Sequence, residues 1–134
     1  MTRSEKLLRV LLRIVGSSAL LAAPCAMMPY AWMDAVHEWL GLGELPAEPV
    51  VGYLARSTSA FYAVIGGLLW VVSFDLRRHR VVLYYLGAAH VLFGLFLVGV
   101  DLAEGMPWWW TVGEGPPTVG FGLLILALVR GLGE

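Results

Sequence analysis

Long apolar runs dominate the pattern of residues along the chain. Four such stretches, separated by short polar segments, cover about 10–28, 50–74, 81–103 and 117–132. A helix that crosses a bilayer needs about 20 mainly apolar residues. The first three stretches meet this length, and the fourth does so if its helix starts at the Pro116–Pro117 pair, because proline is tolerated in a first helical turn. The pattern predicts an all-α fold, an integral membrane four-helix bundle in one transmembrane domain over residues 1–134.

Composition supports a membrane location. Of the 134 residues, 59% are hydrophobic and 14% are charged, whereas soluble domains carry about a quarter charged residues. A body of this size cannot bury so large an apolar surplus, which excludes an ordinary soluble globular domain. The net charge of -1 excludes nucleic acid as a partner held by bulk charge. Cys25 is the single cysteine, so no disulfide within the chain and no CxxC site is expected.

The charged residues predict an orientation. Eight of the nine basic residues precede the first apolar stretch or lie at its start, between the second and third stretches, or near the end of the fourth. Because basic residues collect on the cytoplasmic side, we expect four spans with the N-terminus and C-terminus both cytoplasmic. The first stretch also resembles a signal peptide in its basic start and Ala-rich end, but we expect it to be retained as a membrane helix. The excess of Arg over Lys, 8 to 1, favours a bacterial plasma (inner) membrane.

Two segments on the outer side are rich in tryptophan. In the first outer loop, about 32–40, the apolar positions Trp32, Val36 and Trp39 share one helical face, which predicts a short interfacial helix. Gly41 and Gly43 follow it and are expected to end it. The second outer loop holds Trp108, Trp109 and Trp110, and tryptophans at this level form an interfacial belt. The Gly/Pro run that follows, 113–117, predicts a rigid turn into the fourth helix.

Arg56 and Asp101 are the first candidates for a polar intramembrane site. Arg56 lies inside the second apolar stretch, on the side opposite to the other basic residues. A charge at this depth pairs with another charge or faces an aqueous cavity. In an antiparallel hairpin whose turn centre lies between Arg78 and His79, Asp101 is level with Arg56. Two interpretations stay open, a structural salt bridge that fixes helix register and a binding site open to the outer leaflet.

Small residues suggest how these helices meet. Ser59, Ala60, Ala63 and Gly67 follow Arg56 on one face, and the third stretch carries a matching stripe of Gly87, His90, Gly94, Val98 and Asp101. Such stripes allow close helix packing in lipid, so we expect the second and third helices to pack through them.

His90 and Glu114 complete the candidate site. His90 lies near mid-membrane and is either a buried neutral histidine that hydrogen-bonds to a neighbouring helix or a proton-relay or ligand-binding group. Glu114, flanked by Gly113, Gly115 and Pro116, is either a solvated loop acid or folds back to Arg56 and closes the site. Aromatic residues around the site, as pocket-lining or interfacial groups, are Tyr53, Tyr62, Trp108, Trp109 and Trp110. No metal site and no catalytic triad is expected from the sequence.

Three segments resemble a known family. They are the runs 53–62, 73–78 and 99–116, and they are similar to segments of small bacterial four-helix membrane proteins that are loosely DoxX-like. The resemblance covers about Met33 to Arg130. DoxX-like proteins include small subunits of quinone-linked membrane oxidoreductases, so the resemblance implies a protein partner. It also implies that Arg56, Asp101 and Glu114 belong to one site.

Three functions follow as alternatives. The first is a non-catalytic accessory or assembly subunit of a larger membrane complex, with partners in that complex or in a homo-oligomer. The second is a lipid- or quinone-binding membrane protein with an outer-leaflet pocket around Arg56 and Asp101. The third is a proton-coupled transporter or membrane enzyme that uses His90. We expect no cofactor other than a bound lipid or quinone, and membrane lipids as surroundings and partners.

Overall fold

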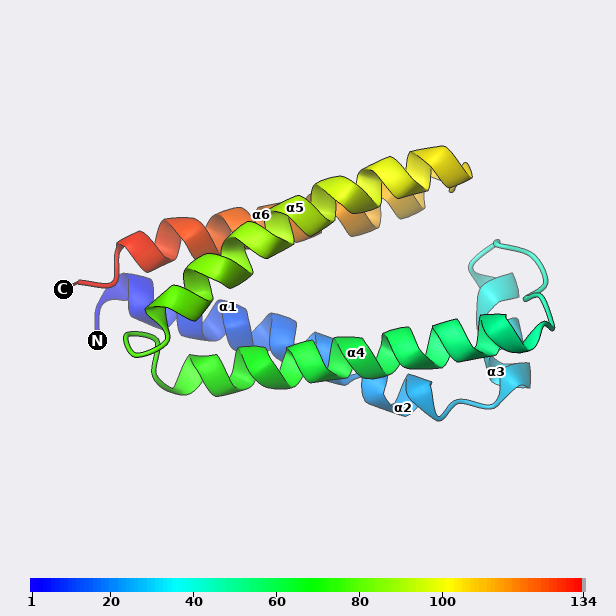
Figure 1. The fold of residues 1–134 in the computed structure, drawn as a ribbon, viewed down its shortest axis with the longest axis horizontal. Coiled ribbons are helices and arrows are strands. Elements are labelled where there is room, and N and C mark those ends of the chain that lie inside the picture. The colour runs from blue at the N-terminus through cyan, green and yellow to red at the C-terminus, as the bar shows by residue number, and fades with distance from the viewer. Residues whose placement is uncertain (134) are drawn as a thin grey trace. The chain divides into compact units, whose positions relative to one another are not determined.

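The computed structural model describes residues 1–133, which form helices joined by short connections. Within this range no residue belongs to a β-strand. The helices are α1 (Arg3–Leu20), α2 (Ala22–Ala26), α3 (Tyr30–Trp39), α4 (Pro49–Phe74), α5 (Arg80–Glu104) and α6 (Trp108–Arg130) (Figure 1). The protein is all-helical, as the sequence predicts.

Four helical segments are long and apolar enough to cross a membrane. They are Arg3–Ala26, which joins α1 and α2, and the helices α4, α5 and α6. Each corresponds to one of the four apolar stretches of the sequence. By length and composition the chain is therefore compatible with a multi-pass membrane protein.

The first helix begins earlier than the apolar pattern predicts, at Arg3 instead of about residue 10. The backbone N–H of Thr2 donates to the Glu5 carboxylate at 2.7 Å, and the N–H of Glu5 donates to the Thr2 hydroxyl at 3.2 Å. This reciprocal pair is a capping box, which satisfies N–H groups that a helix start leaves without partners. The helix then breaks at Leu21, three residues before Pro24, whose ring opposes the carbonyl of Leu20.

The fourth spanning helix corrects the predicted boundary at about 117. Helix α6 starts at Trp108 and continues through Pro116 and Pro117, so the run 113–117 is helical and not a turn. The two prolines remove two backbone hydrogen bonds from the helix. Close packing at Gly115 offsets that loss, since a Cβ added there would lie 3.0 Å from the carbonyl oxygen of Gly94 on α5. Packing against α5 thus outweighs the low helix propensity of the two prolines.

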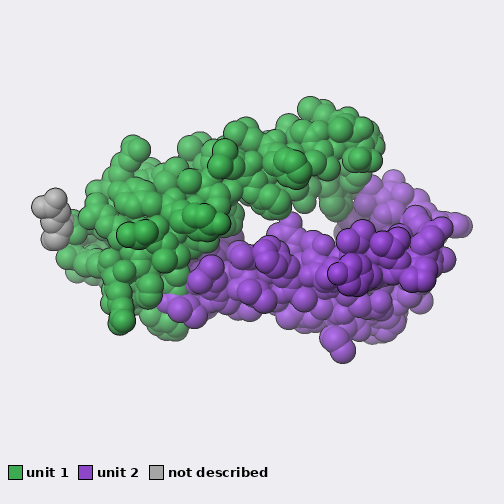
Figure 2. Space-filling model, viewed as in Figure 1, with its two compact units in different colours: residues 1–11, 72–134 green, residues 12–71 purple. Residues whose placement is uncertain are grey.

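The chain divides into two units, coloured in Figure 2: residues 1–11 with 72–134, and residues 12–71. In the first unit, α5 and α6 pack along their length as an antiparallel hairpin. Gly94 faces Gly115, and Gly87 faces Gly122, where an added Cβ at Gly122 would lie 2.5 Å from the Gly87 carbonyl oxygen. Along each helix the two glycines are seven residues apart, so they lie on one face of that helix. Small residues give helices the close approach that stabilises packing in lipid.

All four spanning segments contribute to the buried core of this first unit. Its fully or almost fully buried apolar side chains are Leu8, Val72, Leu76, Leu83, Leu86, Phe121, Ile125, Val129 and Leu132. The start of α1, the end of α6 and the α4–α5 turn lie at the same end of the unit (Figure 1). Most of the basic residues are gathered there.

In the second unit, α1 and α4 also meet at a pair of glycines. A Cβ added at Gly66 would lie 2.6 Å from the Gly16 carbonyl oxygen. Near this contact the Trp70 indole N–H donates to the Ser17 hydroxyl at 3.1 Å, and the Arg13 guanidinium lies 4.9 Å from the centroid of the Trp70 ring. A cation over an aromatic face is attracted by the ring quadrupole.

These contacts correct the predicted partners of the small-residue stripes. Gly87 and Gly94 of the third predicted span pack on α6, whereas the sequence predicted α4 as their neighbour. On α4 the close contact is made by Gly66, and an added Cβ at Gly67 would meet nothing within 4 Å. The α5 stripe is a packing surface at Gly87 and Gly94, as expected, but it faces α6, and the packing glycine of α4, Gly66, lies outside the predicted α4 stripe.

Helix α3 is held by its own following loop. The Tyr30 hydroxyl donates to the Leu45 carbonyl, and the Leu45 N–H donates to the Asp34 carboxylate at 2.7 Å. The helix ends in a Schellman motif, with Gly41 at φ 76° and bonds from the N–H groups of Gly41 and Leu42 to the carbonyls of Glu38 and His37. Its apolar side chains Trp32, Val36 and Trp39 stay exposed.

Candidate functional site

Asp101 is the most unusual side chain of the candidate site. It extends the Gly87–Gly94 stripe of α5 by a further seven residues and therefore lies on the face that packs against α6. Only 4% of the residue is exposed, and its Oδ2 has no hydrogen-bond partner within the described residues. Thr111 of α6 has a buried hydroxyl that likewise lacks a partner there. A buried carboxylate without a partner is costly, and in a membrane such a residue marks a functional site by default.

The backbone around Asp101 shows why it lies at a helix end. Gly105 adopts a left-handed conformation with φ 69°, and the N–H of Met106 donates to the Asp101 carbonyl at 2.9 Å. The carbonyl of Asp101 is thus used to close the C-terminus of α5. Its carboxylate is left for another role.

Arg56 is exposed on α4 and clamps the connection between α2 and α3. Its Nη2 donates to the Met28 carbonyl at 2.9 Å. The Met28 carbonyl lies outside the helices and has no helical N–H to accept from, so the guanidinium supplies its hydrogen bond. Arg56 and Asp101 belong to the two separate units, so their pairing stays a prediction.

Glu114 has a partner within its own helix. The Trp110 indole N–H donates to its Oε2 at 2.9 Å. With Trp109 and Gly113, these two residues line a surface pocket of about 310 Å³. Glu114 is a helical residue, and the prediction that a rigid turn holds it is wrong.

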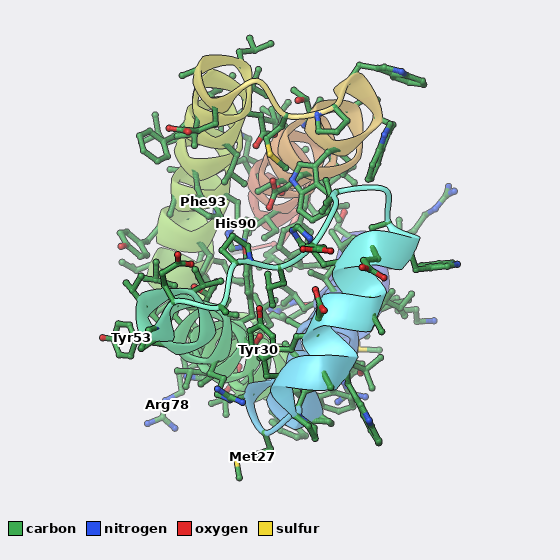
Figure 3. All side chains as sticks on the ribbon, turned by 90° about the vertical axis from the view of Figure 1, so that its right-hand side faces the viewer. Met27, Tyr30, Tyr53, Arg78, His90 and Phe93 are labelled. Carbon is green, nitrogen blue, oxygen red and sulfur yellow. The ribbon has the colours of Figure 1, made fainter. Side chains whose placement is uncertain are left out.

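His90 is partly buried and hydrogen-bonds within its own helix, whereas the sequence predicted a buried histidine bonded to a neighbouring helix. Its Nδ1 lies 2.7 Å from the Leu86 carbonyl oxygen one turn earlier, and its ring packs edge-on against Phe121 with centroids 4.9 Å apart. Because a carbonyl oxygen only accepts hydrogen bonds, Nδ1 carries the proton. Figure 3 labels this histidine on α5 beside Phe93.

The aromatic residues expected around the site differ in exposure. Tyr53 projects away from α4 and is 68% exposed (Figure 3), as is Trp108 at 77%. Trp109 and Tyr62 are partly covered, at 39% and 37%. Trp109 also packs against Trp110 with ring centroids 5.8 Å apart. Trp109 and Trp110 therefore line a pocket, and Tyr53 and Trp108 face outward.

Tyr30 and its loop form a polar cluster that the sequence did not single out. Burial raises the pKa of the Tyr30 phenol, and the carboxylates of Asp34, Glu48 and Glu44 raise it further. The hydroxyl stays protonated and can donate to Leu45 over a wide pH range. The feature of the sequence that could have indicated this cluster is the group of acidic residues in and after the amphipathic helix.

A second cluster, at the basic end of the first unit, was also missed. Glu5 is 6% exposed, and the Arg77 Nε donates to its Oε1 at 2.5 Å. These residues border a pocket of about 330 Å³. The signal that could have found Glu5 is the capping-box pattern Thr2-x-x-Glu5.

Neither group of polar residues resembles a metal centre. Among the described residues no cluster of three or more His, Cys, Asp and Glu side chains could hold a metal ion. The chain matches no protein family, no curated protein and no solved structure.

Proposed function

We propose that this chain is a small multi-pass membrane protein that acts as a non-catalytic accessory or assembly subunit of a larger membrane complex. The observation that carries the proposal is how its intramembrane polar groups are used. Arg56 binds the Met28 carbonyl, His90 binds the Leu86 carbonyl and Glu114 binds Trp110. Each of these side chains holds a local piece of the fold, which suits a scaffold that other polypeptides pack against.

The exposed apolar side chains fit the same proposal. Helix α3 presents Trp32, Val36 and Trp39 outward, while its polar side chains bind its own loop. We place this helix in the outer membrane interface, as the amphipathic pattern predicts. An aromatic surface of this kind serves both the interface and a protein partner, because tryptophan is enriched in both settings.

Native mass spectrometry of the protein extracted from its own membrane in a mild detergent tests the proposal. We expect the chain to leave the membrane bound to other polypeptides at fixed stoichiometry. A His90→Phe variant, which keeps the ring contact with Phe121, should enter the same complex in the same amount. Extraction only as a monomer or homo-oligomer, with no other polypeptide bound, would contradict the role of a subunit in a larger complex.

Asp101 favours a second candidate function, a lipid- or quinone-binding site at the outer leaflet. Its buried carboxylate has an oxygen without a partner in the described chain, and sites for small apolar ligands are mostly apolar with a few placed polar groups. Here the ligand would supply the missing donor, as the hydroxyl of a lipid headgroup or of the reduced quinol can, since the carbonyl oxygens of an oxidised quinone only accept hydrogen bonds. An organic adduct in the same mass spectra that disappears in Asp101→Asn and persists in Glu104→Gln supports this candidate.

A further inference from the structure

We propose that the pocket at the basic end of the chain binds a phosphate group, such as that of an anionic phospholipid. The pocket has a volume of about 330 Å³ and lies between the start of α1, the end of α4 and the α4–α5 turn. Its lining includes Glu5, Arg9, Phe74, Asp75 and Arg77. All of them belong to the first unit.

The hydrogen-bonding groups of the pocket have a surplus of donors. Both oxygens of Glu5 are used, Oε1 by Arg77 and Oε2 by the Thr2 N–H. One oxygen of Asp75 accepts from the Arg78 N–H at 3.1 Å. By contrast, the Nε of Arg9 is buried and has no partner in the described chain. A buried guanidinium donor requires an acceptor, and a phosphate oxygen is the strongest that a membrane surface offers.

The charge around the pocket favours an anion. Among the described residues 1–133, this end of the first unit carries two acids, Glu5 and Asp75, against the basic residues Arg3, Lys6, Arg9, Arg77, Arg78, Arg80 and Arg130. A surface with such an excess of one sign concentrates counter-ions. Near an anionic leaflet each basic side chain adds about 1 kcal/mol of attraction to lipid.

The rim of the pocket favours a lipid over a free ion. Phe74 lies at its edge with 65% of its surface exposed, at the last residue of a membrane-spanning helix. An acyl chain that descends from a phosphate held by Arg9 and Arg77 would lie along this ring. Free phosphate shares the recognition chemistry of the headgroup and lacks only this contact.

The test uses the full chain in nanodiscs that contain phosphatidylglycerol and phosphatidylcholine. Retained lipids are counted by native mass spectrometry for the wild type, for Arg9→Gln and for the control Arg78→Gln, which removes the same charge from a residue outside the pocket lining. Loss of one charge-assisted hydrogen bond should lower phosphatidylglycerol retention about tenfold or more in Arg9→Gln. In Arg78→Gln the change should stay within about twofold, as expected for a distant screened charge.

Two further arms separate the sources of the phosphate and guard against misfolding. If Arg9→Gln does not fold, a photoreactive phosphatidylglycerol is crosslinked to the wild type, and the proposal requires adducts on residues 5–9 or 74–77. If inorganic phosphate prevents this crosslink while the lipid is not retained on extraction, the site binds free phosphate. Equal loss of lipid in Arg9→Gln and Arg78→Gln, or crosslinks only elsewhere, overturns the proposal.

Discussion

At the scale of single residues, Asp101 departs most from what packing alone would select. It takes the place that glycine occupies at positions 87 and 94 on the face of α5 that packs on α6. A small side chain would serve the packing, and a buried carboxylate adds a cost that packing does not repay. We propose that it serves a chemical role or meets a partner that supplies a donor.

Replacement of Asp101 distinguishes these roles. If the carboxylate has no permanent partner, Asp101→Asn removes a buried charge, and the free energy of unfolding should stay equal or increase. If Arg56 is its partner, the same change should lower the free energy of unfolding by about 1 kcal/mol or less, because a pair with an exposed guanidinium is screened by solvent. Unfolding in mixed micelles measures the difference, and a double-mutant cycle with Arg56→Gln shows whether the two residues couple.

Tyr30 gives a pH-dependent prediction. Its raised pKa means that the neutral phenol is favoured by the folded loop. The loop should keep this contribution below the ordinary tyrosine pKa of about 10 and lose it as the pH rises through the raised value. In the wild type, the backbone amides of residues 41–48 should lose protection from hydrogen exchange in that alkaline range. In Tyr30→Phe the exchange should already be fast at neutral pH and show no added alkaline step.

Sequence reasoning identified several important residues without finding their partners. Arg56 stands out because of its depth, yet its contact with Met28 depends on how the chain turns between α2 and α3. Likewise, one turn of helix provides the hydrogen bond of His90 to Leu86, and no pattern of apolar residues reveals which side-chain rotamer makes it. Residue types constrain what a site can do, and the backbone decides which groups meet.

At the scale of helices, the glycine pairs explain why these helices pack as they do. Gly87 and Gly94 face Gly122 and Gly115 across the α5–α6 hairpin, and Gly16 faces Gly66 between α1 and α4. Without a hydrophobic driving force in lipid, close packing and backbone contact supply much of the attraction. The spacing of the glycines is visible in the sequence, and the identity of the facing helix is not.

A comparison within α5 tests this packing. Gly94→Leu should destabilise the hairpin by about 1–3 kcal/mol, because an added Cβ there would lie 2.8 Å from the Gly115 carbonyl oxygen. Gly99→Leu is the matched control, since an added Cβ at Gly99 would meet nothing within 4 Å. Unfolding by a denaturing detergent measures both. Equal stability of the two variants would show that α5 and α6 do not approach as described.

The sequence predicts the helices themselves better than it predicts their ends. The three longer spans were predicted from their apolar length, and α4 and α5 differ from the prediction by a residue at most at each end. The start of α6 was missed because two prolines predict a turn, while packing at Gly115 keeps the helix continuous. The start of α1 was missed because a capping box extends a helix into a polar segment that hydropathy ignores.

For the molecule as a whole, the proposed function and orientation depend on four crossings of a membrane. Four helices have the necessary length and apolar character. Eight of the nine basic residues lie near the chain ends or in the α4–α5 turn, and seven of the ten acidic residues lie in or beside the other connections. We propose from this asymmetry that both termini face the cytoplasm. The phosphate pocket would then face the inner leaflet, and Asp101 would lie toward the outer one.

Cysteine accessibility in intact bacterial cells tests the arrangement of four crossings with both termini in the cytoplasm. Single cysteines are introduced by Arg78→Cys in the α4–α5 turn, and by Ala47→Cys and Glu104→Cys in the other two connections, all in a Cys25→Ala background. A membrane-impermeant maleimide should label positions 47 and 104 in intact cells, and position 78 only after the cells are permeabilised. Labelling of position 78 in intact cells, or of position 47 without position 104, would contradict the four-span arrangement with cytoplasmic termini.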